Sequence, residues 1–238
     1  MNFKDCLLKY SEKTDLKLTE SQLTQFDIYF QMLIEKNKVM NLTAITEVED
    51  VVLKHMLDSL FAYEEEFFGA NAKVCDLGTG AGFPGMPLKL YRPELDITLM
   101  DSLGKRLKWL DEVIQALQLN NIQTCHMRAE DAGHSKQHRE KYDVVASRAV
   151  ARLSVLAEYC LPLVKVNGVF VAMKAASYEQ ELEEAQNALK VLGGEVLRIK
   201  PVCLPELTDK RVIIYIRKTN NTLKTYPRRA GVPDKNPL

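Results

Sequence analysis

The sequence lacks the features that mark membrane-spanning, secreted and zinc-binding proteins. No apolar run approaches the roughly 20 residues that a membrane helix requires, and the first residues show no signal-peptide pattern. The five cysteines are scattered and form no Cys-x-x-Cys pair, so neither a disulfide framework nor a zinc site is indicated. We therefore expect a cytoplasmic protein with reduced cysteines and no bound metal.

The sequence also has no net charge, with 32 basic and 32 acidic residues, but the charges are unevenly spread. Residues 217–238 contain six lysines and arginines and one aspartate, which gives this segment a net charge of +5. A basic tail on an otherwise acidic body favours an anionic partner such as a nucleic acid. Charge alone is equally compatible with a solvated tail that binds nothing. We expect residues 219–238, which are also rich in proline, to be irregular.

Strand signals are missing from the first 70 residues, where the pattern is helical. Thr19-Glu20-Ser21-Gln22 fits a capping box, and apolar residues follow it at helical spacing. The apolar spacing over residues 48–60 indicates another helix. We therefore predict an N-terminal helical extension over residues 1–70.

From residue 71 to residue 218, short apolar strands alternate with amphipathic segments. The predicted strands are Lys73–Leu77, Ile97–Asp101, Ile122–Met127, Asp143–Ser147, Val169–Lys174, Glu195–Ile199 and Arg211–Arg217. Nearly all-apolar strands separated by helices are typical of a parallel sheet with both faces covered. We predict a doubly wound α/β core, with the last strand as an antiparallel insertion and with ligand at the carboxyl ends of the strands.

A glycine-rich loop follows the first predicted strand. Residues 76–85 read Asp-Leu-Gly-Thr-Gly-Ala-Gly-Phe-Pro-Gly, and the last six of them match G-x-G-x-x-G. That match alone is weak, since dinucleotide-binding loops share it. Asp76 would repel a pyrophosphate but can serve a cationic amino group. Phe83-Pro84 places a ring and a residue without an N–H where a dinucleotide loop needs hydrogen-bond donors.

Two further acidic positions complete a site for a ligand with a ribose, an adenine and an ammonium group. Asp101 ends the second predicted strand, where an acid holds a ribose, and Ser102 is expected to cap the next helix. Ala129-Glu130 follows the third strand and can cap an adenine amino group. With Asp76, these residues favour S-adenosylmethionine over a nicotinamide dinucleotide. Each acid has a structural alternative: a loop cap for Asp76, a helix-terminal charge for Asp101 and a solvated turn residue for Glu130.

Six segments of the chain resemble one known family. They are Asn41–Ile45, His55–Leu60, Asp76–Leu88, Met100–Arg106, Ser147–Ala151 and Tyr226–Pro233. They are similar to the RsmG (GidB) family of bacterial methyltransferases, and the resemblance covers nearly the whole chain. It implies a seven-stranded, Rossmann-like class I methyltransferase sheet with an N-terminal helical extension. It also implies S-adenosylmethionine-dependent methylation of a guanine N7 in the 530 loop of 16S rRNA, with guanine 527 as the family target.

The predicted cofactor site combines the resemblance with the residue patterns. The resemblance implies contacts at Gly78, Phe83, Ala129-Glu130 and Arg148. The full set of predicted cofactor-binding residues is Asp76, Gly78, Gly80, Gly82, Phe83, Asp101, Ser102, Ala129, Glu130 and Arg148.

Methyl transfer to guanine N7 needs no general base, because this nitrogen already carries a lone pair, and catalysis can rest on positioning. This agrees with the lack of an evident Ser-His-Asp or Cys-His arrangement. We expect Arg148 to be catalytic, since a guanidinium can donate two hydrogen bonds to guanine O6 or to the cofactor carboxylate. Its structural alternative is a surface salt bridge. For His55, Asp58 and Asn41, contacts at the site and structural hydrogen bonds or caps both stay open.

Basic and aromatic residues supply the predicted contacts to 16S rRNA, since cations bind phosphates and a tyrosine ring can stack on a base. These candidates are Lys105, Arg106, Lys174, Tyr226, Arg228 and Arg229. Neither DNA nor a membrane is an expected partner. Two other functions stay open: a methyltransferase of the same fold with a small-molecule or protein substrate, and a non-catalytic RNA-binding protein that holds the cofactor.

Overall fold

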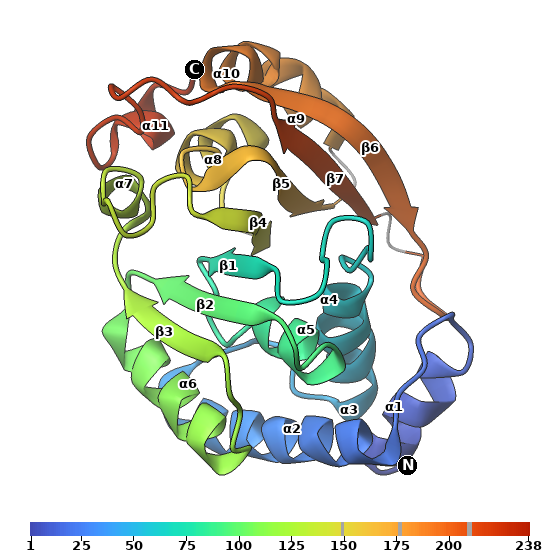
Figure 1. The fold of residues 1–238 in the computed structure, drawn as a ribbon. Helices are drawn as coiled ribbons and strands as arrows, with labels where there is room; N and C mark the ends of the chain where they lie inside the picture. The colour runs from blue at the N-terminus through green and yellow to red at the C-terminus, as the bar shows by residue number, and fades with distance from the viewer. Residues whose placement is uncertain (149, 176–177, 209–210) are drawn as a thin grey trace.

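A computed structural model gives the fold of the chain and describes all residues except 149, 176–177 and 209–210 (Figure 1). Seven strands form one sheet in the order β3-β2-β1-β4-β5-β7-β6. Their bounds are β1 Lys73–Leu77, β2 Asp96–Asp101, β3 Ile122–His126, β4 Tyr142–Arg148, β5 Val164–Lys174, β6 Gly194–Val202 and β7 Arg211–Lys218. The pairs among β1 to β5 are parallel, and β7 runs antiparallel to β5 and β6. The predicted α/β sheet and its antiparallel last strand are confirmed; Ala149 of the Ser-Arg-Ala motif lies outside the described residues.

The N-terminal part is helical, as predicted. Its elements are α1 Phe3–Ser11, α2 Glu20–Met40, α3 Val48–Val51, the π-helical turn η1 Val52–Leu57 and α4 Asp58–Leu60. Thr19 and Gln22 exchange hydrogen bonds at the start of α2, which confirms the predicted capping box. Asn41 ends the same helix as its C-cap, with a φ of 49°, so the capping role holds for this residue.

Helices cover both faces of the sheet (Figure 1). The N-terminal helices share one apolar core with α5 (Gly85–Tyr91), α6 (Gly104–Ala116) and one sheet face. A second apolar core lies under α8 (Leu153–Cys160), α9 (Tyr178–Glu184) and α10 (Gln186–Leu192). Two short helices, α7 (Ala129–Ala132) and α11 (Val232–Lys235), both contact α8. The carboxyl ends of the central strands are therefore left between these layers.

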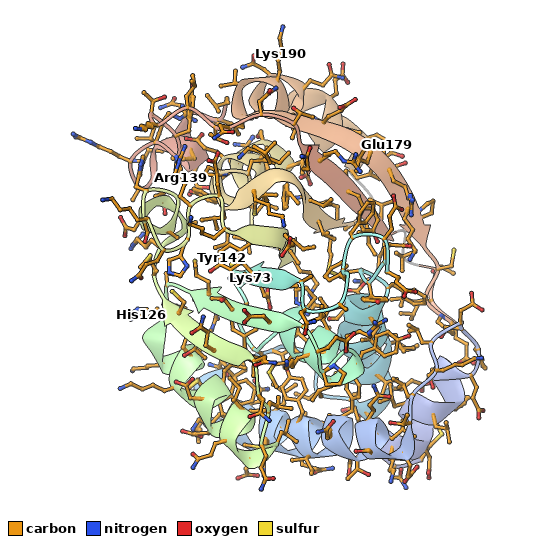
Figure 2. All side chains as sticks on the ribbon, viewed as in Figure 1. Lys73, His126, Arg139, Tyr142, Glu179 and Lys190 are labelled. Atoms are coloured by element: carbon orange, nitrogen blue, oxygen red, sulfur yellow. The ribbon has the colours of Figure 1, made fainter. Side chains whose placement is uncertain are left out.

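The C-terminal segment, residues 219–238, is folded onto the body of the protein. The Arg139 guanidinium donates hydrogen bonds to the carbonyls of Thr222, Leu223 and Tyr226, and the side chain lies beside α7 in Figure 2. Lys218, just before the segment, is fully buried and donates to the Leu161 carbonyl. Most of the segment is irregular, as predicted, but it is anchored, and part of the basic charge assigned to it is not available to a partner.

Two earlier expectations, reduced cysteines and no membrane-spanning segment, can be compared with the structure. All five cysteines are free; Cys6, Cys75 and Cys160 are buried, whereas Cys203 is exposed. No helix in the described part of the chain combines the length and the apolar character needed to cross a membrane.

Candidate active site

The glycine loop joins β1 to α5 at the carboxyl edge of the sheet. Gly78 and Gly80 have φ angles of 73° and 58°, which glycine adopts at little cost. The N–H groups of Gly78 and Thr79 donate to the carbonyl of Met100 in β2. A Cβ added at Gly78 would lie 2.5 Å from Val150 Cγ2. Glycine is therefore required where the loop meets the segment after β4, and the loop forms a tight cradle.

Asp76 lies beneath this loop and is fully buried. Its Oδ2 accepts hydrogen bonds from Thr79 Oγ1 at 2.6 Å and from the Gly85 N–H at 2.8 Å. Within the described residues, Oδ1 has no hydrogen-bond partner. Burial raises the pKa of Asp76 to about 6, although the two hydrogen bonds and Arg148 act to lower it. Asp76 therefore holds the loop from below and places a titratable charge there; its predicted contact with a ligand amino group stays a prediction.

Asp101 ties the glycine loop to the start of α6. Its Oδ2 accepts from the Gly80 N–H at 2.9 Å, and its Oδ1 accepts from the Leu103 N–H at 2.8 Å. Arg106 Nη1 lies 3.9 Å from the same Oδ2. Leu103 occupies the N-cap position of α6, so the predicted capping role of Ser102 is wrong. Ser102 is instead exposed at the rim of the site.

Two adjoining cavities bring most of the predicted cofactor residues together. One, of about 430 Å³, is lined by residues that include Gly78, Gly80, Phe83, Asp101, Ser102 and Arg148. The other, of about 240 Å³, is lined by residues that include Gly78, Asp101, Ser102, Ala129 and Glu130. The shared residues make the two cavities one elongated site. Gly82 differs, because a Cβ there would lie 2.6 Å from Met86 Cγ and 2.9 Å from Tyr29 Oη; its role is close packing under the loop.

Arg148, at the end of β4, is held by a network at the mouth of the 430 Å³ cavity. Its Nη1 donates to Asp58 Oδ2 and to the Lys54 carbonyl, both at 3.0 Å. Its Nη2 lies 3.2 Å from His55 Nδ1, and the guanidinium lies 4.9 Å from the centre of the Phe83 ring. Only 14% of the Arg148 side chain is exposed. The salt bridge considered as an alternative is thus largely buried, and it fixes the guanidinium at the cavity.

His55 is a neutral hydrogen-bonded residue in this network. Its Nδ1 lies 3.2 Å from Arg148 Nη2 and 3.2 Å from the Lys54 carbonyl, and its Nε2 lies 2.7 Å from Thr43 Oγ1. Burial, followed by the charge of Arg148, lowers the pKa of His55 to about 3. The imidazole also stacks on Phe83, with 4.5 Å between the ring centres. His55 and Asp58 therefore make structural hydrogen bonds, and they do so at the site, where they orient Arg148.

A third cavity, of about 590 Å³, adjoins the same network. Its lining includes Lys54, His55, Asp58, Arg148, Lys174 and Arg211. Arg211 Nη1 lies 3.3 Å from Asp58 Oδ1, so this carboxylate is shared between two guanidinium groups. His55 and Arg148 line both this cavity and the 430 Å³ cavity. The two spaces therefore meet at these two side chains.

The basic residues assigned to RNA from the sequence differ in accessibility. Lys105 is exposed on the first turn of α6, and Arg106 is half-buried at the rim of the 430 Å³ cavity. Lys174 is only 7% exposed; its ammonium donates to the Ala151 carbonyl at 2.7 Å and pairs with Glu181 at 2.6 Å. Lys174 therefore belongs to the wall of the 590 Å³ cavity, and its predicted contact with RNA stays a prediction.

The tail residues predicted to contact RNA also differ in their exposure to solvent. Arg228 makes hydrogen bonds through Nη2 and Nε to the Glu158 carboxylate, at 2.6 and 2.9 Å, and Glu158 is 1% exposed. Tyr226 is half-buried. Arg228 therefore anchors the tail through Glu158, which corrects its predicted RNA role; the predicted stacking of Tyr226 on a base stays a prediction. Arg229 is exposed.

Two polar residues of α2 support the site and were not predicted. The buried Tyr29 hydroxyl donates to the carbonyl of Ala81 in the glycine loop. The Asn37 side chain accepts from the N–H groups of Leu42 and Thr43, at 2.7 and 2.9 Å. Leu42 and Thr43 line the 430 Å³ cavity. The sequence does place a hydroxyl and an amide on the inward face of this helix. Helical spacing predicts that such side chains are buried, but it does not predict which loop they contact.

The two sides of the site differ in charge. Carboxylates lie in or beneath the elongated site at Asp76, Asp101, Glu130 and Asp234, and Arg106 and Arg128 also line it. The 590 Å³ cavity is lined by the cations Lys54, Arg148, Lys174 and Arg211 and by the carboxylates Asp58 and Glu181, so cations are in excess there. The elongated site suits a ligand with hydroxyl, amino or cationic groups, and the other cavity suits an anionic one. Among the residues that the structure describes, no cluster of three or more His, Cys, Asp or Glu could hold a metal ion.

Comparisons with known proteins agree with this arrangement. A family model for GidB, described as rRNA small subunit methyltransferase G, matches residues 22–210. Ribosomal RNA small subunit methyltransferase G of Desulforamulus reducens is 48% identical over 98% of this chain and 97% of that protein. The protein of the same name from Bacillus subtilis is 48% identical over 100% of this chain and 99% of that protein.

Solved structures share the fold at low sequence identity. M. jannaschii TYW2 in complex with AdoMet has a TM-score of 0.52 and 16% identity, over 68% of this chain and 76% of that chain. The fibrillarin pre-rRNA processing protein of Methanococcus jannaschii has a TM-score of 0.53 and 14% identity, over 68% of this chain and 74% of that chain. At such identities the likeness shows the Rossmann-like sheet and nothing finer.

Proposed function

We propose a specific reaction from the premise that this chain belongs to the GidB family of small-subunit rRNA methyltransferases and is such an enzyme. The reaction is methyl transfer from S-adenosylmethionine to N7 of a guanine in the 530 loop of 16S rRNA, with guanine 527 as the target. The observation that carries the proposal is the meeting of the carboxylate-lined site and the cation-lined cavity at Arg148 and His55. Ligands in the two spaces would bring their reacting groups together at this junction.

The residues of the elongated site fit S-adenosylmethionine. Asp101, at the end of β2, would hold the ribose hydroxyls, and Glu130 would accept from the adenine amino group. The cradle of Gly78 and Gly80 allows close approach of the methionine part. The unpartnered Asp76 Oδ1 beneath the cradle makes the local potential negative, which suits a cationic ligand. The cofactor supplies the methyl group on its sulfonium; the protein binds and orients it.

The cation-lined cavity suits a guanine nucleotide of RNA. Lys54 and Arg211 line it and would attract the phosphate. Arg148 is fixed by Asp58 and the Lys54 carbonyl and has further N–H donors that can reach guanine O6. A hydrogen bond to O6 alone leaves the lone pair of the neighbouring N7 free for the methyl group. Arg148 is therefore the proposed catalytic residue.

The surroundings of His55 agree with a reaction that needs no general base. Both ring nitrogens have hydrogen-bond partners, and the pKa of about 3 keeps the ring neutral. A neutral N7 acceptor has no proton to release when it is methylated. Positioning two ligands at the junction is then the protein's main contribution to the rate.

Three exposed or half-buried cations at or beyond the rim of the 430 Å³ cavity are proposed to contact RNA phosphates. They are Lys105 and Arg106 on the first turn of α6 and Arg229 in the tail. These contacts would orient the RNA without reading its sequence. The compartment that this substrate requires is the bacterial cytoplasm.

An in vitro assay with two matched RNAs tests the proposed reaction. The purified protein is incubated with methyl-labelled S-adenosylmethionine and 16S rRNA or small subunits, and labelled positions are mapped by cleavage at 7-methylguanine. We expect one labelled guanine in the 530 loop. The control RNA carries 7-deazaguanine at that position, where carbon replaces N7, and should take up no label. Label on the control RNA would place the methyl group on another atom and overturn the proposal.

A further inference from the structure

We infer that the C-terminal segment Tyr226–Lys235 is one wall of the adenine end of the cofactor site, and that it contributes to cofactor binding. This rests on the proposed function, because it takes the 240 Å³ cavity to be the adenine end. Gly231 and Asp234 of the segment line that cavity together with Ala129 and Glu130 of α7. Two segments about a hundred residues apart in the sequence thus enclose one pocket.

Three independent contacts anchor the segment and hold it in place. The Arg228 guanidinium is paired with the buried Glu158 of α8. His134 Nε2 donates to the Pro227 carbonyl at 2.7 Å. Pro227 also packs so closely on Gly133 that a Cβ at this position would overlap it. Because all three anchors precede residue 231, the chain enters the pocket wall from a fixed point.

The wall itself is tied to α8 by a further hydrogen bond. The Tyr159 hydroxyl donates to Asp234 Oδ2 at 3.1 Å, and Tyr159 lines the same cavity. Asp234 remains exposed at the rim, whereas Glu130 is 9% exposed. The pocket therefore presents a carboxylate from each of two walls and a phenol ring between them.

The chemistry of this pocket favours a neutral base over a phosphate group. The carboxylates of Asp101, Glu130 and Asp234 outnumber the one guanidinium in the lining, that of Arg128, and they can accept hydrogen bonds from an exocyclic amino group. Met100, Met127 and Val150 supply apolar lining for a flat ring. The pocket also shares Gly78 and Asp101 with the 430 Å³ cavity, so a base bound here would be continuous with a ribose at Asp101. Adenine has this combination of an amino donor and apolar faces.

This inference changes the role given to the tail. A tail that served RNA alone would present all of its cations, whereas here only Arg229 of the Arg228-Arg229 pair is exposed. Here Arg228 is committed to Glu158, and the residues that reach the pocket are a glycine and an aspartate. We therefore assign the segment primarily to cofactor binding and only secondarily to RNA binding.

The test compares a chain that ends at Ala230 with the full chain. Both chains keep all three anchors. Asp234→Ala is the matching single change, and Lys235→Ala is the control because Lys235 is an exposed neighbour on the same turn. Calorimetry measures affinity for S-adenosylmethionine and for 5′-methylthioadenosine, which has the adenosine part but no amino acid. Loss of one hydrogen-bonding wall should weaken both ligands by about 3- to 10-fold in the shortened chain and in Asp234→Ala. The Lys235→Ala chain should bind both ligands as the full chain does.

The other outcomes overturn the inference in distinguishable ways. Unchanged affinity of the shortened chain for both ligands excludes a cofactor role, and a simultaneous loss of rRNA binding with a flatter salt dependence would return the segment to an RNA arm. If the full chain binds neither ligand, the proposed cofactor fails first and the inference with it. If the shortened chain has a lower thermal unfolding midpoint, its weaker ligand binding could reflect lost stability. The affinity of Asp234→Ala then decides whether the segment binds the cofactor, since this variant keeps the full chain and its anchors.

Discussion

Two buried charges, those of Asp76 and Arg148, decide how the site works at the scale of single residues. Asp76 lies under the glycine loop with one oxygen satisfied and the other without a partner among the described residues. Arg148 is held by a carboxylate, a carbonyl and a neutral imidazole. The first can change its charge near neutral pH, whereas the second is permanently charged. Their effects should therefore be separable by pH and by substitution.

Cofactor binding should tighten as the pH rises from about 5 to about 7. Asp76 has a pKa of about 6 without ligand, and its ionised form attracts a cationic ligand. The Asp76→Asn protein should bind about tenfold more weakly at about pH 7.5 and show a flatter pH profile by calorimetry. Affinity of the unchanged protein that does not vary with pH would contradict this. The stability of the unliganded protein should change in the opposite direction. Folding raises the pKa of Asp76 from 3.8 to about 6, so the folded state favours the protonated carboxyl. This contribution to the free energy of unfolding is fully present below a pH of 3.8 and is lost as the pH rises through about 6.

Replacing Arg148 should slow turnover far more than it weakens rRNA binding. Arg148→Ala removes a fixed donor at the junction, so we expect kcat to fall about 100-fold. Arg148→Lys keeps the charge but loses the fork that engages Asp58, the Lys54 carbonyl and His55, and should also be slow. Lys105→Ala, an exposed control, should weaken RNA binding with little effect on kcat. Equal kcat values for Arg148→Ala and the unchanged protein would remove its catalytic role.

At the scale of secondary-structure elements, the sequence predicted the sheet well and the tail poorly. Each predicted strand exists within a few residues, because short apolar runs between helices have few alternatives. Asp101 and Glu130 could be placed because the ends of parallel strands meet at one edge. The anchoring of Arg228 could not, since its partner Glu158 lies 70 residues away on α8. Nothing local distinguishes an arginine that meets RNA from one that meets a buried glutamate.

The N-terminal extension should affect cofactor binding through Tyr29. Its hydroxyl donates to the Ala81 carbonyl in the glycine loop from α2, and both groups are buried. Tyr29→Phe leaves that carbonyl without this donor, so we expect the free energy of unfolding to fall by about 1–3 kcal/mol. Cofactor affinity should fall as well, because the loop loses its support. Ile28→Ala, on the exposed side of the same helix, is the control for helix effects and should leave cofactor affinity unchanged; equal behaviour of the two variants would sink the idea.

The tail should contribute measurably to stability through one ion pair. Arg228→Ala leaves the Glu158 carboxylate, which is 1% exposed, without its cation. Removing one partner of a buried pair costs about 3–5 kcal/mol, measured by urea unfolding. Arg229→Ala, its exposed neighbour, should change stability by less than about 0.5 kcal/mol. If both substitutions have the smaller effect, the tail is not anchored as described.

At the scale of the whole molecule, one sheet edge gathers three regions of the chain. The N-terminal helices supply His55, Asp58 and the support of the glycine loop, the sheet supplies Asp101 and Arg148, and the C-terminal segment closes one end. The elongated site and the 590 Å³ cavity, which has an excess of cations, meet there at His55 and Arg148. Sequence patterns placed the cofactor side, since its acids follow strands in a known order. Arg148 and Lys174 of the 590 Å³ cavity were predicted to meet the acceptor, but the cavity itself was not predicted, because it forms between η1, β5 and β7, which are distant in the sequence.

The most direct test of the central claim is mass spectrometry of 16S rRNA from cells that lack this protein. The account predicts that 7-methylguanine disappears from position 527 in the 530 loop and from no other position. It also predicts that the unchanged protein restores the modification, whereas Arg148→Ala does not. Persistence of 7-methylguanine at this position in cells without the protein would contradict the account.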